Sequence, residues 1–387
     1  MIDDDILLNL RVLAAARRES GDGRLILNPD PLSFEHSEAP TDFESGPVPG
    51  QVLEPNENTP FALRKLAKRL HKVNIEGFCD GIRSTYFVGH EDHLPIIYAR
   101  NASVIRTRDC MTGYHANRYG MRRQQAILLA PFSLFDQATL TVYERLKLYK
   151  SRHADLCWTG LDNWSGDSAK YIPTPAEMKQ MGNVSWQYRA RRRARHLLDL
   201  SEQITAMAGA RLLREQDPTG KSWLLKDGSF SQFRREYLRL AEPLRNIVSC
   251  VKTHPVSYFG IDGERILHQM EIGQRSVAFL PRPALQAQKG YSLQETDRPM
   301  ISWYLRVRQA NSHDANHMSG IVRLDIATID DWSDWIDEIS WAVLDEFHGI
   351  SSMPDPRYDV MPYGIYDCEQ FLKAQQLPGE LLLAQLR

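Results

Sequence analysis

Apolar segments of strand length recur along this chain, and their order is the strongest constraint on its fold. A first block covers residues 75–90, 93–109 and 124–135. A long helix is expected next, over 185–214, and strands then alternate with helices to the end of the chain. The later strands are expected near 222–230, 246–254, 301–309 and 320–328. This order predicts an α/β layer fold around one mixed β-sheet flanked by helices.

Outside that block, the sequence predicts helices at 6–18, 134–150, 231–245, 331–348 and 362–377. It also predicts a short helix that begins after Thr59 and carries basic residues on one face. Residues 20–60 are rich in Pro, Gly and acids and have few apolar positions. We therefore expect an N-terminal helix and extended arm over 1–58, followed by one domain over 59–387. The arm is a candidate partner-docking segment, with a disordered spacer as the alternative.

Composition excludes several classes of protein. The 387 residues carry 47 Lys and Arg against 49 Asp and Glu, so the chain is not a bulk polycation. No apolar run approaches the roughly 20 residues of a membrane-spanning helix, and the acidic start Met1-Ile2-Asp3-Asp4-Asp5 is unlike a secretory signal. Five scattered cysteines without a CxxC pair favour reduced thiols. These features predict a cytoplasmic protein that does not associate with membranes.

The first block is expected to hold strands with intervening turns, and two short strands of the chain are each expected to end in the dipeptide Asp-Gly. These dipeptides are Asp80-Gly81 and Asp227-Gly228. A carboxylate at the end of an apolar strand is costly unless something pairs with it, and a divalent cation is one such partner. Asp-Gly is also a common turn dipeptide, so an ordinary turn is the alternative reading of each.

The long helix begins with a cluster of arginines and continues with acids. Its arginines can bind phosphate oxygens or form a solvent-exposed helix face, and the residue types alone do not decide between the two. Asp199 and Glu202 lie three positions apart and share a face, so either one could point toward a metal site. Lys252 follows an apolar strand, where a lysine can stabilise a phosphate or be an ordinary exposed strand end. The arginines of the cluster are Arg189, Arg191, Arg192, Arg193 and Arg195.

Taken in order, these segments resemble the NurA nuclease family. The resemblance covers roughly residues 75–375 and leaves out the first 60. Its pieces are Gly77–Arg83, the arginine-rich helix, Leu224–Ser229, Ile247–Thr253, Trp303–Val307, Ile321–Asp325 and Met361–Glu369. It implies an RNase H-like fold, a homodimer, dependence on Mn²⁺ or Mg²⁺, and a partnership with HerA, a hexameric DNA-translocating ATPase.

The resemblance also assigns roles to residues. Asp80 and Asp227 match the family's metal aspartates, and Lys252 matches its strand lysine. Asp199 stands where the family has a helix glutamate, with Glu202 as the alternative, and Glu369 stands at the C-terminal metal position. Arg83 and the arginine cluster would guide the nucleic acid strand.

These roles lead to the expectation of a metal-dependent deoxyribonuclease, exo- or endonucleolytic, acting in DNA repair or antiviral defence. Two cations bridged by an aspartate can activate a water and stabilise the leaving oxygen of a phosphodiester. Asp199 in place of Glu and Glu369 in place of His or Asp also allow an inactive adaptor that dimerises, docks on the ATPase and guides DNA. An RNA-directed nuclease is a third reading.

Overall fold

The structure is a computed structural model. It describes residues 5–30, 50–54, 59–92, 94–109, 113–115, 122–130, 136–144, 155–159, 201–230, 241–252, 258–281, 300–309, 318–327, 332–347, 360–375, 381, 384 and 386.

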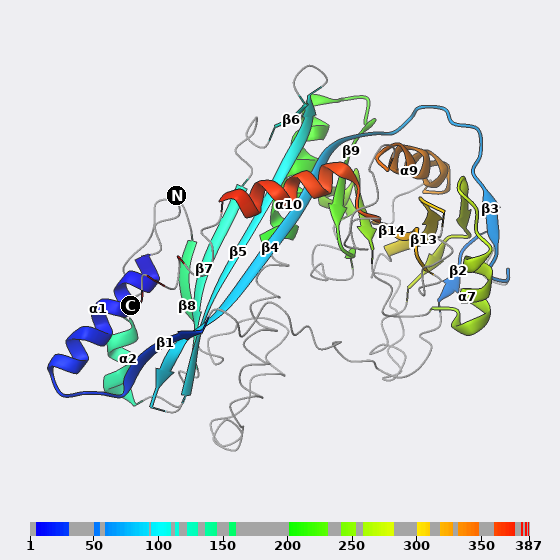
Figure 1. Cartoon of the computed structure of the whole chain (residues 1–387). Coiled ribbons are helices and arrows are strands. Elements are labelled where there is room, and N and C mark those ends of the chain that lie inside the picture. Colours follow the sequence, from blue (N-terminus) through cyan, green and yellow to red (C-terminus); the bar gives the residue numbers. More distant parts are fainter. Residues whose placement is uncertain are drawn as a thin grey trace.

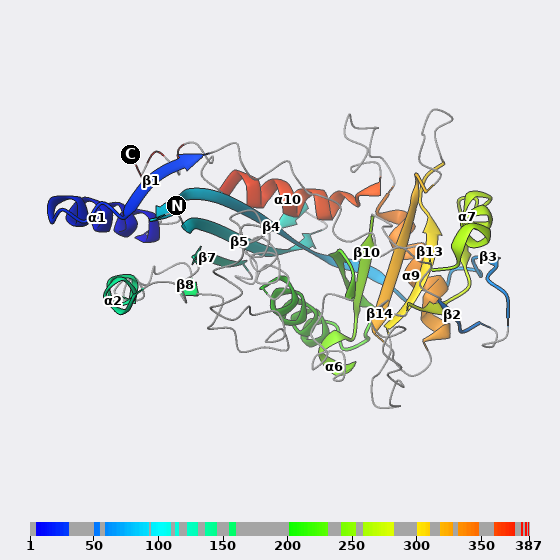
Figure 2. The same cartoon turned by 90° about the horizontal axis from the view of Figure 1, so that it is seen from below.

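One large mixed sheet organises the chain, and helices cover both of its faces (Figures 1 and 2). Fourteen strands belong to it within the described residues. The α/β class predicted from the strand order is therefore confirmed. In spatial order the main path is β2 (Gln51–Val52), β12 (Phe279–Leu280), β13 (Met300–Arg306), β14 (Ile321–Ala327), β10 (Ile247–Val251), β9 (Ser222–Asp227), β4 (Asn74–Glu91), β5 (Leu94–Asp109), β7 (Arg122–Leu129) and β8 (Asp155–Thr159).

Four shorter strands pair beside this path. β1 (Leu25–Asp30) pairs with β4, and β6 (Gly113–His115) pairs with β5. β3 (Leu63–Lys65) pairs with β11 (Gln274–Ser276), and β11 also pairs with β13. Three pairs are parallel, namely β4 with β9, β9 with β10 and β7 with β8. Because β4, β9 and β10 run in the same direction, the carboxyl ends of β9 and β10 reach one edge of the sheet together.

The helices belong to two layers. Their bounds are α1 (Asp5–Glu19), α2 (Gln137–Glu144), α6 (Ala241–Leu244), α7 (Gly260–His268), α9 (Ser333–Asp345) and α10 (Tyr363–Gln375), together with a helix over residues 201–216. Figure 2 shows α10 on one face of β4 and β5, and the helix of residues 201–216 on the other. The expected helices at 6–18, 331–348 and 362–377 are confirmed by α1, α9 and α10.

Alternation along β4 explains the two layers. Phe78 is fully buried in a core cluster with Ile365 and Cys368 of α10, whereas Cys79 is buried in a separate cluster with Ala206 and Ala210. Successive strand residues face opposite sides, so each side of β4 presents one apolar set to one helix. Burial of a Phe side chain contributes about 1.5–3 kcal/mol.

Close contact between α10 and β4 depends on a glycine. A Cβ added at Gly364 would lie 2.3 Å from the ring of Phe78. The Sγ of Cys368, one turn later, lies 3.5 Å from the carbonyl oxygen of Phe78. The helix therefore lies directly on the strand that carries Asp80.

The described parts of the N-terminal region lie against the sheet. Leu7 and Leu10 of α1 share a buried cluster with Tyr86 and Tyr98 of the β4–β5 hairpin. The buried guanidinium of Arg17 donates to both carboxylate oxygens of Glu91, each at 2.7 Å. Residues 31–49 of the expected arm lie outside the described residues.

The prediction of a short helix after Thr59 is wrong. Residues 59–73 contain no helix, and β3 is their only regular element among these described positions. The backbone N–H groups of Leu70 and Lys72 donate to the two oxygens of Glu338 of α9, at 2.5 and 2.7 Å. Because side chains of a neighbouring helix bond these donors, the segment has no need of intrahelical bonds.

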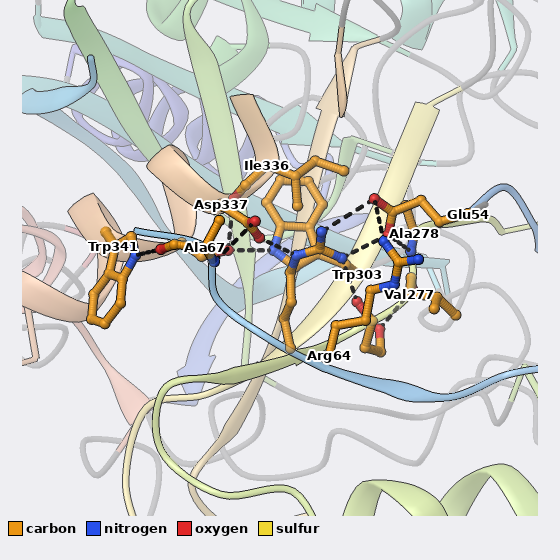
Figure 3. A network of polar contacts seen from close by, with 12 residues as sticks. Glu54, Arg64, Ala67, Val277, Ala278, Trp303, Ile336, Asp337 and Trp341 are labelled. Carbon is orange, nitrogen blue, oxygen red and sulfur yellow. Dashed lines mark hydrogen bonds and ion pairs between the residues drawn. The ribbon is translucent and has the colours of Figure 1, made fainter. Parts of the chain in front are cut away.

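Buried charges complete the attachment of this segment. Asp337 accepts from the N–H of Ala67 at 3.2 Å and from the Nε of Arg275 at 2.5 Å (Figure 3). Arg275 also donates to Glu54 at 2.7 Å, and Trp341 donates its indole N–H to the carbonyl of Ala67 at 2.8 Å. The network ties α9 to the strands β2, β3 and β11. We call residues 64–72 the basic ribbon.

Candidate functional site

The parallel pairing of β4 and β9 brings two predicted aspartates together. Cys79 is opposite Lys226 in the register of the two strands. One residue further along each strand come Asp80 and Asp227, so the parallel register places the two residues beside each other. The two Asp-Gly dipeptides, 147 positions apart in sequence, therefore meet at one point of the sheet. The predicted strand end at Asp80-Gly81 is wrong, because β4 continues to Glu91 and pairs with β5 through both residues.

A glycine turn ends β9 immediately after Asp227. Gly228 has φ +74°, in the left-handed region that favours glycine. Its N–H donates to the carbonyl of Cys250 on β10 at 3.0 Å. The turn leads the chain away from the sheet while the side chain of Asp227 stays beside β4 and β10.

Asp80 is an electrostatically unfavourable carboxylate. It is buried, with 5 % of its surface exposed. Burial and the neighbouring charge of Asp227 raise the pKa of Asp80 well above its usual range, while Lys252 and the N–H of Gly81 act in the opposite direction. A raised pKa for a buried acid beside another acid is typical of functional carboxylate pairs.

Lys252 supplies the positive charge at this point. It follows β10 directly, and its Nζ lies 2.8 Å from Oδ1 of Asp227. Burial lowers the pKa of Lys252, but the charges of Asp227 and Asp80 outweigh burial and raise it overall. The structure thus brings Asp80, Asp227 and Lys252 together, two carboxylates with one ammonium group.

Glu202 lies on the other face of the sheet. Its Oε1 is 2.5 Å from Nζ of Lys226, and both side chains are nearly inaccessible to solvent. Lys226 also donates to the backbone carbonyl of Asp227. Burial lowers the pKa of Lys226, but Glu202 outweighs it and raises the pKa overall. Lys226 was not among the predicted site residues, although a lysine directly after the apolar run Trp223–Leu225 and inside a predicted strand signals a buried partner.

Glu369 is paired within its own helix. Its Oε1 lies 2.7 Å from Nζ of Lys373, four residues later on α10. The groups that shift the pKa of Asp80 are Asp227, Lys252, Glu202 and the N–H of Gly81. The structure thus shows Glu369 in contact with a lysine and gives no contact between Glu369 and the aspartates.

The predicted nucleic-acid contacts are only partly described. Arg83 is half-buried on β4, opposite Asn101 of β5. Its odd position places it on the face of Cys79, opposite to that of Asp80. Asp199 and the arginine cluster Arg189, Arg191, Arg192, Arg193 and Arg195 lie outside the described residues.

The basic ribbon is a cationic surface, and its residues belong to the segment for which a short helix was predicted. Lys65, Lys68 and Lys72 are exposed, and none of the three forms an ion pair with a described residue. Two other cations of the ribbon are neutralised, Arg64 by Glu54 at 3.8 Å and Arg69 by Asp345 at 2.6 Å. The ribbon leads directly into β4, so Lys72 and Asp80 are at most about 29 Å apart along the chain.

The donors available to a metal ion are the two aspartates. In the part of the chain that the structure describes, no group of three or more His, Cys, Asp or Glu side chains is arranged to hold a metal. Mg²⁺ is commonly held by one or two carboxylates with water in its other positions, and carboxylate oxygens also suit Mn²⁺. Asp80 and Asp227 are compatible with such a site, because one ammonium group offsets only one of their two charges.

Comparison with known proteins adds no assignment. Neither a protein-family model nor a curated protein matches this sequence. Within the described residues, no helix has the length and apolar character needed to cross a membrane.

Proposed function

We propose that this chain is a metal-dependent deoxyribonuclease of the NurA type, with an RNase H-like arrangement of its sheet. It hydrolyses phosphodiester bonds of DNA, with Mn²⁺ or Mg²⁺ as cofactor. It acts as a homodimer with a HerA-type hexameric ATPase, in the cytoplasm, in DNA end processing or antiviral defence.

One observation carries the proposal. Asp80 and Asp227 stand side by side on parallel strands, and burial together with Asp227 raises the pKa of Asp80. Such a pair is costly for the fold without a cation, so a role in cation binding explains why the fold contains it. The position of Lys252, 2.8 Å from Asp227, supports an anionic substrate at the same place.

Each residue of the trio has a role in this chemistry. A bound divalent cation supplies Lewis acidity and a more acidic water. Asp80 and Asp227 hold it through their carboxylate oxygens. Lys252 holds a proton at Nζ and offers it as a hydrogen-bond donor to the scissile phosphate, where negative charge develops. Lys252 would make this donation from its place beside Asp227, where its Nζ lies 2.8 Å from the carboxylate.

The basic ribbon supports DNA as the substrate. Three exposed lysines without described ion pairs lie on a segment whose backbone is held by α9. Phosphates repeat every 3.4 Å along one strand of duplex DNA, so a stretch of at most about eight nucleotides is needed to reach from Lys72 to Asp80. A rigid row of lysines contacts such a backbone without sequence preference.

A second candidate function is an inactive adaptor that docks on the ATPase and guides DNA. The observation that favours it is the small number of acids, because no third described carboxylate joins Asp80 and Asp227 in a metal-holding group, and Glu202 is paired with Lys226. An adaptor would bind DNA through the basic ribbon without cutting it.

Cleavage of labelled linear DNA by the full chain separates the two functions. Single- and double-stranded substrates are incubated with Mn²⁺, Mg²⁺ or EDTA, with and without the ATPase. We expect Mn²⁺-dependent cleavage that Asp80→Asn and Asp227→Asn both abolish. Lys221→Met is the matched control, because Lys221 is exposed and precedes β9 at its opposite end.

Two other outcomes are decisive. Cleavage that persists in both aspartate variants would exclude this site as the catalytic centre. Absence of cleavage by a folded wild-type protein in complex with the ATPase would favour the adaptor.

A further inference from the structure

A buried carboxylate lies behind the turn that carries Asp227. Asp325 on β14 is completely inaccessible to solvent, between Ser249 of β10 and Ser302 of β13. Its Oδ1 accepts from Ser302 at 2.7 Å, and its Oδ2 accepts from Ser229 at 2.8 Å. Arg323 donates to both oxygens, at 2.9 and 3.2 Å.

The same network connects two segments of the candidate site. Ser229 follows Asp227 by two residues, and the N–H of Phe230 also lies 3.4 Å from Oδ2 of Asp325. Arg323 donates to the Oγ of Ser229 at 2.9 Å and to the hydroxyl of Tyr258, six residues after Lys252, at 3.0 Å. One buried ion pair therefore contacts the chain beyond Asp227 and the chain beyond Lys252.

Stability alone does not explain such an arrangement. Apolar residues of similar volume often replace a buried ion pair without loss of stability, because desolvation offsets the Coulombic gain. Orientation of a neighbouring ligand is a use that apolar residues cannot replace, because hydrogen bonds restrict direction and packing alone does not.

We propose that Asp325 and Arg323 are positioning residues that hold Asp227 in its metal-binding orientation through Ser229. The inference rests on the proposed metal centre and adds a supporting layer to it. The hydroxyl of Ser229 is the link, because it donates to Asp325 and accepts from Arg323. Ser302 donates to the same carboxylate from β13, which carries no residue of the site.

Ser229 and Ser302 provide a matched pair of variants. Ser229→Ala and Ser302→Ala each remove one hydroxyl donor from Asp325, one from each oxygen. Mn²⁺ affinity of the full chain is measured by isothermal titration calorimetry, and the thermal midpoint is measured in EDTA. We expect similar midpoints for the two variants. Ser229→Ala lowers Mn²⁺ affinity by about 10- to 100-fold, the usual effect of losing a support of a metal ligand, whereas Ser302→Ala stays within about twofold of wild type.

The outcomes separate this inference from the function on which it rests. Wild type that binds Mn²⁺, with equal affinities in the two variants, would overturn the positioning role alone. Wild type that binds no Mn²⁺ would overturn the metal centre and the positioning role with it. As a further check, Arg323→Lys keeps the charge but loses the paired donation, and we expect it to weaken Mn²⁺ binding as Ser229→Ala does.

Discussion

Lys252 Nζ lies 2.8 Å from Asp227 Oδ1, so the residue after β10 neutralises the last residue of its parallel neighbour β9. Asp80, Asp227 and Lys252 together carry two negative charges and one positive charge. Because Lys252 pairs with Asp227, no positive group of the three pairs directly with Asp80. Lys252 therefore neutralises a carboxylate that a bound divalent cation would also neutralise. The interaction therefore links the stability of the protein without metal to its affinity for metal.

Replacement of this lysine should change stability and metal affinity in opposite directions. Lys252→Met leaves Asp227 and Asp80 side by side without a cation, so the free energy of unfolding in EDTA should fall by about 1–3 kcal/mol. Mn²⁺ affinity should rise at least roughly tenfold, because the site then has two uncompensated charges. Urea denaturation and calorimetric titration measure the two quantities, with Lys221→Met as the control. Weaker Mn²⁺ binding would show that Lys252 supports the cation and does not compete with it.

Asp80 should make stability depend on pH. Its pKa in the folded chain is raised, so the folded state holds its proton more tightly than the unfolded state does. Stability in EDTA should therefore fall as pH rises from the usual Asp value of about 3.9 toward the raised pKa, and then level off. Each unit of difference corresponds to about 1.4 kcal/mol.

The isosteric Asp80→Asn variant tests this sign. It should match wild type near pH 4 and be more stable at pH 7, as measured by denaturation midpoints across this range in EDTA. Mn²⁺ at pH 7 should raise the midpoint of wild type and leave that of the variant unchanged, because ligands stabilise only the state that binds them. A variant less stable than wild type at pH 7 would contradict the electrostatic explanation.

Glu202 should behave as the partner of Lys226 and not as a metal ligand. Glu202→Gln leaves a buried ammonium group unpaired, so the free energy of unfolding should fall by about 3 kcal/mol. Lys226→Met should be destabilising for the same reason, and the double variant should recover part of the loss, with a coupling of about 1–3 kcal/mol. The double variant should bind Mn²⁺ within about twofold of wild type. A tenfold loss in that stable double variant would make Glu202 a ligand.

The basic ribbon should contribute to DNA affinity through salt-dependent contacts. Lys65→Ala/Lys68→Ala/Lys72→Ala should reduce the slope of log affinity against log salt by about 2–3, since each phosphate contact contributes about 0.7–0.9. Fluorescence anisotropy with labelled DNA over a range of salt concentrations measures the slope. Lys221→Ala/Arg211→Ala/Arg265→Ala removes the same charge from exposed positions elsewhere and should leave the slope nearly unchanged. Equal slopes in the two triple variants would contradict the role of the ribbon.

Local pattern was sufficient for the central strands of the sheet. The long apolar runs of β4, β5 and β14 predict strands, because burial on both faces requires apolar side chains at successive positions. An Asp-Gly dipeptide after apolar residues indicated both Asp80 and Asp227, since an acid beside buried apolar side chains requires a partner. Only Asp227 ends its strand, because β4 continues beyond Asp80 to Glu91. These inferences need only the neighbours of a residue in the chain.

Tertiary structure decided which of these residues meet. The parallel register places Asp80 beside Asp227 and sends Lys226, one position away, to the opposite face with Glu202. Likewise, Glu338 of α9 bonds the backbone of the basic ribbon and keeps it extended, although its sequence favours a helix. In both cases the deciding partner lies far away in sequence, and periodicity and propensity contain no information about distant hydrogen bonds and ion pairs.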